Sequence, residues 1–331
     1  MRRIKILSCL ILMALFNCPI SWATVSRVVL ISFDGLRPDV ISTFKEKLPH
    51  FYQLIKEGAT TLNARTDADF TVTIPNHTCM LTGRGVVGAA GHNVILNKDT
   101  SQSIHELKGA YVKSVFDVVR DQKLSSAMYA SKTKFRIFAD SFPIDDVHLT
   151  DHNDAQTMES LRDLFKGDRL PAFLFIHFSG ADNAGHKDGW NVDGQSSYMR
   201  AVFLLDDYLG QIMTAVRNLN EQGKATVLIV TSDHGGTQRH HAAFQNRKNY
   251  TIPFLVWGAQ VARGKDLYEL NKTGRANPGR AWIPYSEPVQ PIRNGEAANL
   301  ALRLLGLSCV PQSTVGCSPT LIVEDQSQGQ K

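Results

Sequence analysis

Carboxylate and imidazole side chains follow three separate apolar segments of this 331-residue chain. They are Asp34; Asp182 and His186; Asp233 and His234; and, a few residues further on, His240 and His241. Carboxylates and imidazoles together suit zinc, with Mn²⁺ or another divalent ion as the alternative. Because zinc usually takes about four ligands, the set is too large for one ion. It therefore predicts two metal ions a few ångströms apart, an arrangement that can hold the attacking and leaving oxygens of an in-line displacement.

A candidate nucleophile lies between the first two of these segments. Pro75 suits the first turn of a helix, which puts Thr73 at the helix N-terminus. Free backbone N–H groups and the helix dipole favour an anion there. A threonine hydroxyl is a poor nucleophile at neutral pH, and a bound metal would activate it as an alkoxide. Without a metal nearby, Thr73 would be a plain N-cap residue.

The three apolar segments are predicted to be buried β-strands that position these side chains. They cover residues 27–33, 172–178 and 225–231, and helical patterns lie at residues 48–57, 113–121, 155–166, 196–218 and 294–305. This alternation predicts an α/β fold with a mainly parallel central sheet and helices on both faces. In such folds the ligand site forms beyond the carboxyl ends of the strands, where the acidic and histidine residues lie.

The N-terminal segment is predicted to be a signal peptide. Residues 1–23 begin with a basic stretch, continue through an apolar run too short to span a bilayer comfortably, and end with small residues around Ala23. The alternative is an uncleaved membrane anchor. Cleavage leaves residues 24–331 as a single catalytic domain, which is exported to the periplasm or secreted and has no stable membrane anchor.

Composition argues against polyanionic partners. The whole chain is 43% hydrophobic and 20% charged, with a formal net charge of +5. Loss of the predicted signal peptide, which carries Arg2, Arg3 and Lys5 and no acid, lowers that charge to +2. No nucleic-acid-binding surface is indicated by a mature chain so close to neutrality.

Cysteine usage fits an exported protein. Cys309 and Cys317 lie close together in a loop near the C-terminus and are expected to form a disulfide in an oxidising compartment. Cys79 lies in an apolar stretch and is expected to be a buried small hydrophobe.

Two acidic segments are expected to be solvated rather than functional. Residues 145–148 and 151–154 form an acidic, histidine-containing run that could bind a further metal, but they are predicted to form a solvated loop before the next helix. Asp206 and Asp207 are predicted to lie on the polar face of an amphipathic helix.

The ordered set of motifs resembles the alkaline phosphatase superfamily, and most closely its nucleotide pyrophosphatase/phosphodiesterase branch. The matching stretches are Ser-Phe-Asp-Gly-Leu-Arg-Pro-Asp around Asp34, Thr-Ile-Pro-Asn-His from Thr73, the pair Asp182 and His186, and Asp-His-Gly-Gly from Asp233, followed by a final histidine. The resemblance spans most of the chain and implies the three-layer sandwich of that superfamily.

The resemblance also implies roles for individual residues. One zinc would be held by Asp182, His186 and His241, and the other by Asp34, Asp233, His234 and the nucleophile Thr73. His240 is the alternative to His241 as the last ligand. Asn97 would donate to a phosphoryl oxygen together with the backbone N–H at Thr73.

The implied function is zinc-dependent hydrolysis of a small-molecule phosphate ester through a phospho-threonine intermediate, most simply as a phosphodiesterase. Ile74 stands where nucleotide-cleaving relatives often carry a phenylalanine that packs on the base, so the substrate stays open. A phosphomonoesterase or a phosphonate hydrolase could use the same metal core. An inactive relative that binds phosphate or glycan is the alternative from a different class.

Overall fold

The computed structural model describes residues 25–167 and 170–325, and the predicted signal peptide lies outside this range. The described residues form an eight-stranded sheet with the order β4-β3-β5-β1-β6-β7-β2-β8. The strands are β1 (Arg27–Phe33), β2 (Ala59–Arg65), β3 (Ser126–Ala130), β4 (Asp146–Leu149), β5 (Phe173–Phe178), β6 (Thr226–Thr231), β7 (Thr251–Gly258) and β8 (Lys265–Asp266). β7 is antiparallel to both of its neighbours, and the other pairs are parallel. The predicted α/β class with a mainly parallel sheet is confirmed.

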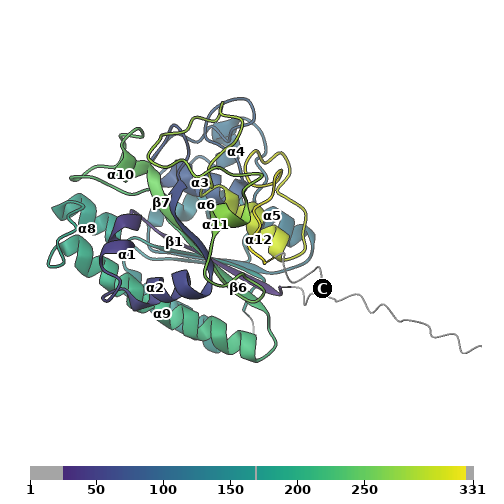
Figure 1. Cartoon of the computed structure of the whole chain (residues 1–331). Coiled ribbons are helices and arrows are strands. Elements are labelled where there is room, and N and C mark those ends of the chain that lie inside the picture. The colour runs from purple at the N-terminus through teal and green to yellow at the C-terminus, as the bar shows by residue number, and fades with distance from the viewer. Residues whose placement is uncertain (1–24, 168–169, 326–331) are drawn as a thin grey trace, which may run out of the picture.

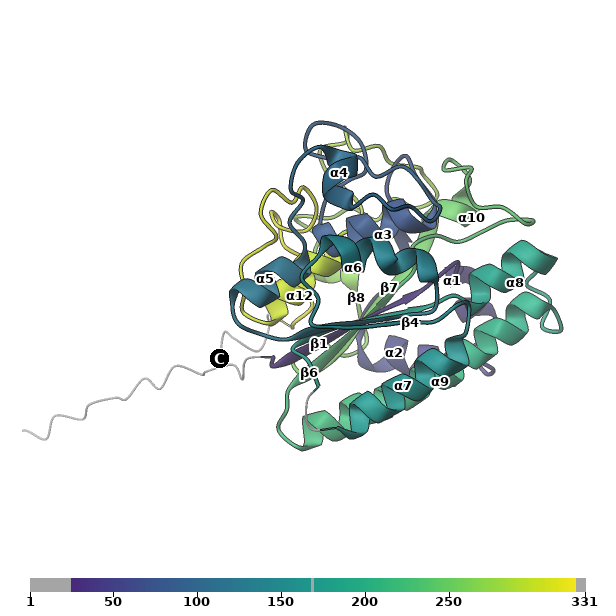
Figure 2. The same cartoon turned by 180° about the vertical axis from the view of Figure 1, so that it is seen from behind.

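Helices cover both faces of the sheet and give three layers (Figures 1 and 2). One layer contains α1 (Pro38–Thr43), α2 (Pro49–Glu57), α7 (Asp154–Lys166), α8 (Gly180–Asp188) and α9 (Ser197–Glu221). The opposite layer contains α3 (Thr73–Thr82), α4 (Ile104–Lys108), α5 (Val115–Asp121), the 3₁₀ turn Thr133–Phe135, α6 (Arg136–Ser141), α10 (Arg247–Tyr250), α11 (Leu267–Leu270) and α12 (Glu296–Leu304). No helix in the described ranges is both long enough and apolar enough to cross a membrane.

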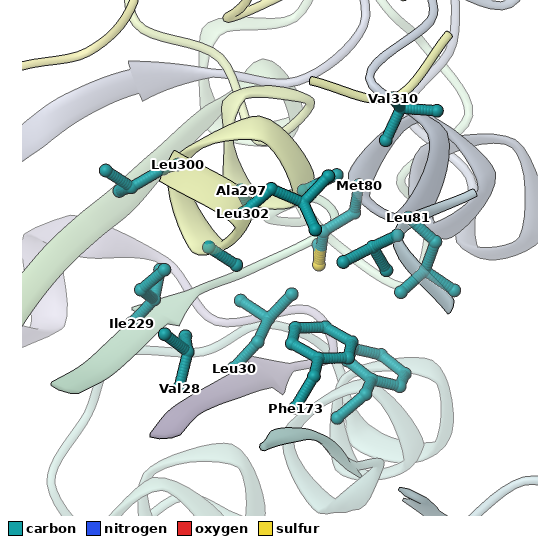
Figure 3. Close-up of a cluster of buried hydrophobic side chains, with 14 of the residues drawn as sticks. Val28, Leu30, Met80, Leu81, Phe173, Ile229, Ala297, Leu300, Leu302 and Val310 are labelled. Atoms are coloured by element: carbon teal, nitrogen blue, oxygen red, sulfur yellow. The ribbon is translucent and has the colours of Figure 1, made fainter. Parts of the chain in front are cut away.

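The alternation of side chains along the strands divides the core into two clusters. In β1, Val28 and Leu30 belong to the cluster under α3, α5 and α12, whereas Val29 and Ile31 belong to the cluster over α2 and α9. Figure 3 shows Leu30 of the first cluster beside side chains from α3 and α12. Both faces of the central strands are thus buried, which is why their sequences are almost continuously apolar.

The strands and helices predicted from the sequence are all present, with ends that differ by a few residues. The predicted disulfide is also confirmed, since Cys309 and Cys317 are bonded, with their Cα atoms 5.7 Å apart. Cys79 is a buried free thiol, as expected. The remaining strands, β2, β3, β4, β7 and β8, were not predicted.

The predicted solvated loop is wrong for residues 146–149, which form the edge strand β4, although residues 145–147 are exposed as expected. Residues 151–153 do form an exposed loop before α7. β4 pairs in parallel with β3, and the Tyr129 hydroxyl donates to Asp146 Oδ2 at 2.8 Å. An edge strand has one side open to solvent, so it can carry polar and charged residues that obscure its strand pattern.

The placement of Asp206 on a polar helix face is also wrong, although Asp207 is exposed as expected. Asp206 is only 1% exposed, and its carboxylate accepts from the backbone N–H groups of Phe51 at 2.8 Å and His50 at 3.2 Å. It therefore satisfies the free N–H groups at the start of α2, which begins at Pro49.

Candidate metal centre and nucleophile

The carboxyl ends of three adjacent strands bring the predicted acidic residues together. β1 lies between β5 and β6, so Asp34 after β1 faces the segments that follow both neighbours. Asp182 N–H donates to Asp34 O at 3.0 Å, and Gly35 N–H donates to Asp233 Oδ1 at 3.2 Å. Gly35 has a φ of 73°, and a Cβ atom there would lie 3.0 Å from Asp182 Cα. A glycine is thus required for the close approach of the two segments.

Two groups of these side chains have ligand atoms close enough to share a cation. The first is Asp182, His186 and His241, and the second is Asp34, Asp182 and His234, with the ligand atoms of each group within 4.8 Å of one another. Asp233 belongs to neither group, but its Oδ2 lies 3.2 Å from His234 Nε2. The structure therefore gathers all six predicted side chains at one place.

The histidine rings are held so that their Nε2 lone pairs face this cluster. Each Nδ1 lies beside a backbone carbonyl oxygen, which can only accept, so Nδ1 carries the proton. These contacts are His234 to Gly235 at 2.8 Å, His241 to Thr71 at 2.6 Å and His186 to Arg239 at 3.1 Å. In the neutral ring the other nitrogen, Nε2, is then an acceptor. Such backbone contacts are the usual way to fix the tautomer of a metal-binding histidine.

Acceptor atoms face acceptor atoms across the cluster. His241 Nε2 lies 3.0 Å from His186 Nε2 and 3.8 Å from Asp182 Oδ1. Within the six predicted side chains, four buried atoms find no hydrogen-bond partner among the described residues: Asp34 Oδ1, Asp182 Oδ1, Asp233 Oδ2 and His234 Nε2. Buried polar atoms are normally satisfied, and a cation would satisfy this set of acceptors. The residues present thus fit one or two divalent ions.

A buried lysine that the sequence reasoning missed lies at the centre of the cluster. Lys132 Nζ donates to Asp34 Oδ2 and to Asp182 Oδ2, both at 2.6 Å, and Lys132 is 3% exposed. Burial alone would lower the pKa of Lys132, but the two carboxylates outweigh it and raise the pKa above its ordinary value. Lys132 follows β3, and its position at a strand end could have signalled its role had β3 been recognised.

One lysine cannot neutralise three neighbouring carboxylates. Burial would raise the pKa of Asp34, but Lys132 and a hydrogen bond from His177 hold it well below its usual value. Burial and Asp34 act to raise the pKa of Asp182, yet Lys132 helps to bring it below its usual value. The pKa of Asp233 is raised well above its usual value by burial and by the charge of Asp34. Asp233 therefore favours its neutral form beside Asp34, and a bound cation would favour the ionised form of all three carboxyl groups.

Thr73 is the first residue of α3 and is 1% exposed. His77, one turn later, donates from Nδ1 to Thr73 O at 2.8 Å, and the same nitrogen lies 3.6 Å from Asp233 Oδ2. Two residues before Thr73, the carbonyl oxygen of Thr71 contacts His241. The start of α3 is thus tied to both sides of the carboxylate–histidine cluster.

Asn97 lies at the N-terminus of the same helix. Its Oδ1 accepts from the Ile74 backbone N–H at 3.0 Å and from Lys134 Nζ at 3.2 Å. Because Oδ1 is engaged, Nδ2 is the atom that can donate to an incoming oxygen. Ile74 itself is fully buried in the hydrophobic core and presents no face to a ligand.

The two histidines left open by the sequence have different environments. His241 is 5% exposed and lies in the first metal-binding group, whereas His240 is exposed and lies in neither group. Geometry therefore favours His241 as the candidate ligand.

The fold and the cluster together define an α/β protein with a candidate metal centre at the carboxyl edge of its sheet. A family model described as type I phosphodiesterase / nucleotide pyrophosphatase matches residues 28–275, which is more than half of the chain. The chain belongs to this family, and with it to the nucleotide pyrophosphatase/phosphodiesterase branch of the alkaline phosphatase superfamily, as the sequence motifs suggested.

Similar proteins agree with this membership. Mouse bis(5'-adenosyl)-triphosphatase enpp4 is 24% identical over 301 residues, which cover 80% of this chain and 63% of that protein. Rat ectonucleotide pyrophosphatase/phosphodiesterase family member 3 is 28% identical over 225 residues, which cover 64% of this chain and 25% of that protein. The chain thus spans from a quarter to just under two thirds of the length of these two relatives.

A solved structure shows the same fold. It is murine ectonucleotide pyrophosphatase / phosphodiesterase 5, an inactive threonine-to-alanine variant in complex with AMP. Its TM-score is 0.62 at 15% identity, and the match covers 86% of this chain and 96% of that one.

Proposed function

We propose that this protein is a metal-dependent hydrolase of phosphate esters, and specifically a phosphodiesterase of the nucleotide pyrophosphatase type. The observation that carries the proposal is the set of buried acceptor atoms facing one another beside the N-terminus of α3. Family membership supports the reaction class, since the matching family is described by its phosphodiesterase and pyrophosphatase activities.

We assign the residues as the sequence motifs implied. Asp182, His186 and His241 would hold one zinc ion, and Asp34, Asp233, His234 and Thr73 would hold the other, with Mn²⁺ or another divalent ion as the alternative metal. When bound, the ions supply positive charge that stabilises the attacking and leaving oxygens of the displacement. Asp182 lies in both groups, so it could also contribute to the second ion.

In the proposed reaction, Thr73 Oγ1 attacks phosphorus and displaces the alcohol or phosphate leaving group, which gives a threonine phosphate ester. Water then attacks the same phosphorus, restores the threonine hydroxyl and releases the phosphorylated product. Backbone N–H groups at the start of α3 and Asn97 Nδ2 would donate to the phosphoryl oxygens, on which negative charge builds up. Burial of Thr73 helps to keep bulk water from the first step.

The test is a Thr73→Ala substitution, with Thr73→Ser as the matched control. We expect Thr73→Ala to lower turnover of bis(p-nitrophenyl) phosphate by at least roughly 10³-fold, because the covalent route is lost. Metal content by elemental analysis should stay near that of the wild type, and Thr73→Ser should keep part of the activity. Near-wild-type turnover in Thr73→Ala would disprove the nucleophile assignment.

Paired assays on p-nitrophenyl phosphomonoester, diester, phosphonate and sulfate, with and without chelator, would rank the substrates. A ranking led by the monoester or the phosphonate would favour the alternatives that share this metal core. Absence of turnover on all four would favour an inactive binding protein.

We also propose that the substrate is a small molecule. From the composition of residues 1–23 we further propose that the protein is exported to the periplasm or secreted.

A further inference from the structure

A cavity of about 530 Å³ lies between α1 and α10, two helices at the same end of the molecule (Figures 1 and 2). It adjoins the candidate metal centre, since a Cβ atom at Gly235, two residues after Asp233, would lie 3.2 Å from Cγ of Arg37. Arg37 lines the cavity, but none of the six candidate metal-binding side chains does. The cavity is therefore a separate feature, which the proposed reaction does not use.

Positive charge dominates this cavity. Its lining includes four cations, Arg37, Arg247, Lys248 and Arg280, and one acid, Asp39. Both oxygens of the Asp39 carboxylate accept from Arg37. The other three cations form no ion pair with a carboxylate anywhere in the described ranges. An anion that enters the cavity therefore meets cations that no neighbouring acid neutralises.

A buried arginine close to the cavity adds to this charge. Arg65 lies opposite Thr251 in the β2–β7 ladder, and Thr251 lines the cavity. Arg65 is 1% exposed, and its hydrogen bonds go to neutral oxygen atoms. Burial lowers the pKa of Arg65 to about 10, and the positive charge of Arg247 contributes to the shift. A bound anion would offset the repulsion between these two arginines.

Exposed cations attract an anion but do not by themselves hold it in one orientation. Arg247, Lys248 and Arg280 are all exposed, so solvent and salt screen their charges. A specific site also needs buried polar groups with free hydrogen-bonding capacity.

Two buried side chains in the lining have such capacity. Arg37 is 4% exposed and makes three hydrogen bonds, two to Asp39 and one to the Trp190 carbonyl oxygen, which leaves two of the five N–H groups of its guanidinium. Thr251 is 7% exposed, and its Oγ1 finds no hydrogen-bond partner in the described part of the chain. Buried hydroxyls are normally paired, and an oxygen atom of a ligand in the cavity would supply the partner.

The rest of the lining favours a ligand with a polar body. Ser42, Thr237 and Asn246 contribute hydroxyl and amide groups, and Pro38 and Leu62 contribute the apolar contacts. No aromatic ring is among the described residues that line the cavity, so a nucleobase has nothing to stack on and a lipid tail has little apolar surface. The volume falls within the range of about 300–1,000 Å³ that is typical of ligand pockets. It has room for a monosaccharide that carries an acidic group.

We propose that this cavity binds a sugar phosphate, with the phosphate beside Arg247, Lys248 and Arg280 and sugar hydroxyls beside Thr251 and Thr237. Neutral sugar would lack the group that the cations recognise, and phosphate alone would leave the hydroxyl and amide groups unused. The same chemistry occurs in free sugar phosphates and in lipid head groups that consist of a phosphorylated polyol. The site is additional to the proposed hydrolysis and does not depend on it.

The test is calorimetry on the zinc-loaded protein with glucose 6-phosphate, glucose and inorganic phosphate. We expect glucose 6-phosphate to bind at least roughly tenfold more tightly than either of the other two, because charge-assisted and neutral hydrogen bonds add. Vesicles that contain phosphatidylinositol, with phosphatidylglycerol vesicles for comparison, show whether the sugar phosphate is recognised free or as a lipid head group.

A double variant, Arg247→Gln with Lys248→Gln, separates this site from phosphate binding at the metal centre. Both side chains are exposed, so folding should be unaffected, and turnover of bis(p-nitrophenyl) phosphate should not change. Affinity for glucose 6-phosphate should fall at least roughly tenfold. Lys45→Gln with Lys47→Gln is the matched control, since these two exposed lysines follow α1 but do not line the cavity, and it should keep the wild-type affinity.

Thr251→Val keeps the branched shape of the side chain and removes the unpaired hydroxyl. We expect affinity for glucose 6-phosphate to fall by about three- to tenfold, the effect of one hydrogen bond. The urea midpoint should stay the same or rise, because a buried polar group without a partner is removed. A lower urea midpoint with unchanged affinity would show that the hydroxyl is structural and would remove Thr251 from the site.

Unchanged affinity for glucose 6-phosphate in the Arg247 and Lys248 double variant would overturn the proposal. Equal affinity of the wild type for inorganic phosphate and glucose 6-phosphate would also overturn it, since the sugar would then not be recognised. Binding to phosphatidylglycerol vesicles without binding of glucose 6-phosphate would indicate a membrane contact instead. None of these results changes the turnover of phosphate esters, which tests the proposed function separately.

Discussion

Two regions of the molecule bury carboxyl groups, and they do so in opposite ways. In the C-terminal region, Arg275 donates to both carboxylate oxygens of Glu296, at 2.7 and 3.0 Å, and also to the carbonyl oxygens of Gly274 and Pro319. At the carboxyl edge of the sheet, Asp34, Asp182 and Asp233 each have a buried oxygen that no donor from the described part of the chain reaches. Complete pairing indicates a structural role, and incomplete pairing indicates a site that needs a ligand.

Of the substitutions that test this difference, Asp233→Asn is expected to have the largest effect, on zinc content and on turnover. The amide keeps an oxygen for the N–H groups of Gly35 and His234 but loses the charge that would bind metal. We expect lower bound zinc and roughly 10³-fold slower phosphodiester turnover, since a metal contributes several kcal/mol to catalysis. The metal-free variant should unfold at the same or a higher urea concentration than the metal-free wild type, because a buried acid is removed. Unchanged metal content would show that Asp233 does not bind the ion.

In the C-terminal region we expect the opposite result, a loss of stability without a loss of bound zinc. Arg275→Ala leaves Glu296 buried without its partner, so the free energy of unfolding should fall by about 3–5 kcal/mol. Urea denaturation measures this loss, and zinc content per folded molecule should not change. Arg303→Ala is the matched control, because the Arg303–Glu324 pair is partly exposed and should contribute only about 0–1 kcal/mol. Equal losses in the two variants would contradict the structural role of the buried pair.

The smallest effect is expected for His240→Ala, which tests the boundary of the metal centre. His240 is exposed, so zinc content and turnover should stay near wild type and stability should change by less than about 0.5 kcal/mol. His241→Ala should lower zinc content clearly. A loss of zinc in His240→Ala alone would reverse the assignment of the last ligand.

The sequence was sufficient to predict the centre of the fold because β1, β5 and β6 are buried on both faces. Their continuous apolar runs are distinctive, and the polar residues after them point to one edge of the sheet. β4 at the edge was missed because a half-exposed strand need not be apolar. Short strands such as β8, with only two residues, have no pattern to detect.

The residues of the candidate site, like the strands, were predicted only in part. The acidic and histidine residues were found because each follows a recognised strand, whereas Lys132 and Lys134 follow β3, which was not recognised. Asp206 was assigned to a polar helix face because the sequence of α9 does not reveal that the start of α2 packs against it. Local patterns locate residues along the chain, but contacts between distant segments decide which polar groups become buried.

The helix that carries Thr73 has a consequence for engineering. All ten residues of α3 are buried, and the helix ends at Gly83, which has a φ of 64° and where a Cβ atom would lie only 2.6 Å from Asn299 Nδ2. Random libraries that include this helix should consist largely of misfolded clones. Directed evolution toward new substrates would do better to vary exposed positions of the neighbouring loops, around residues 95–102 and 238–245, and to leave α3, which carries the proposed nucleophile Thr73, unchanged.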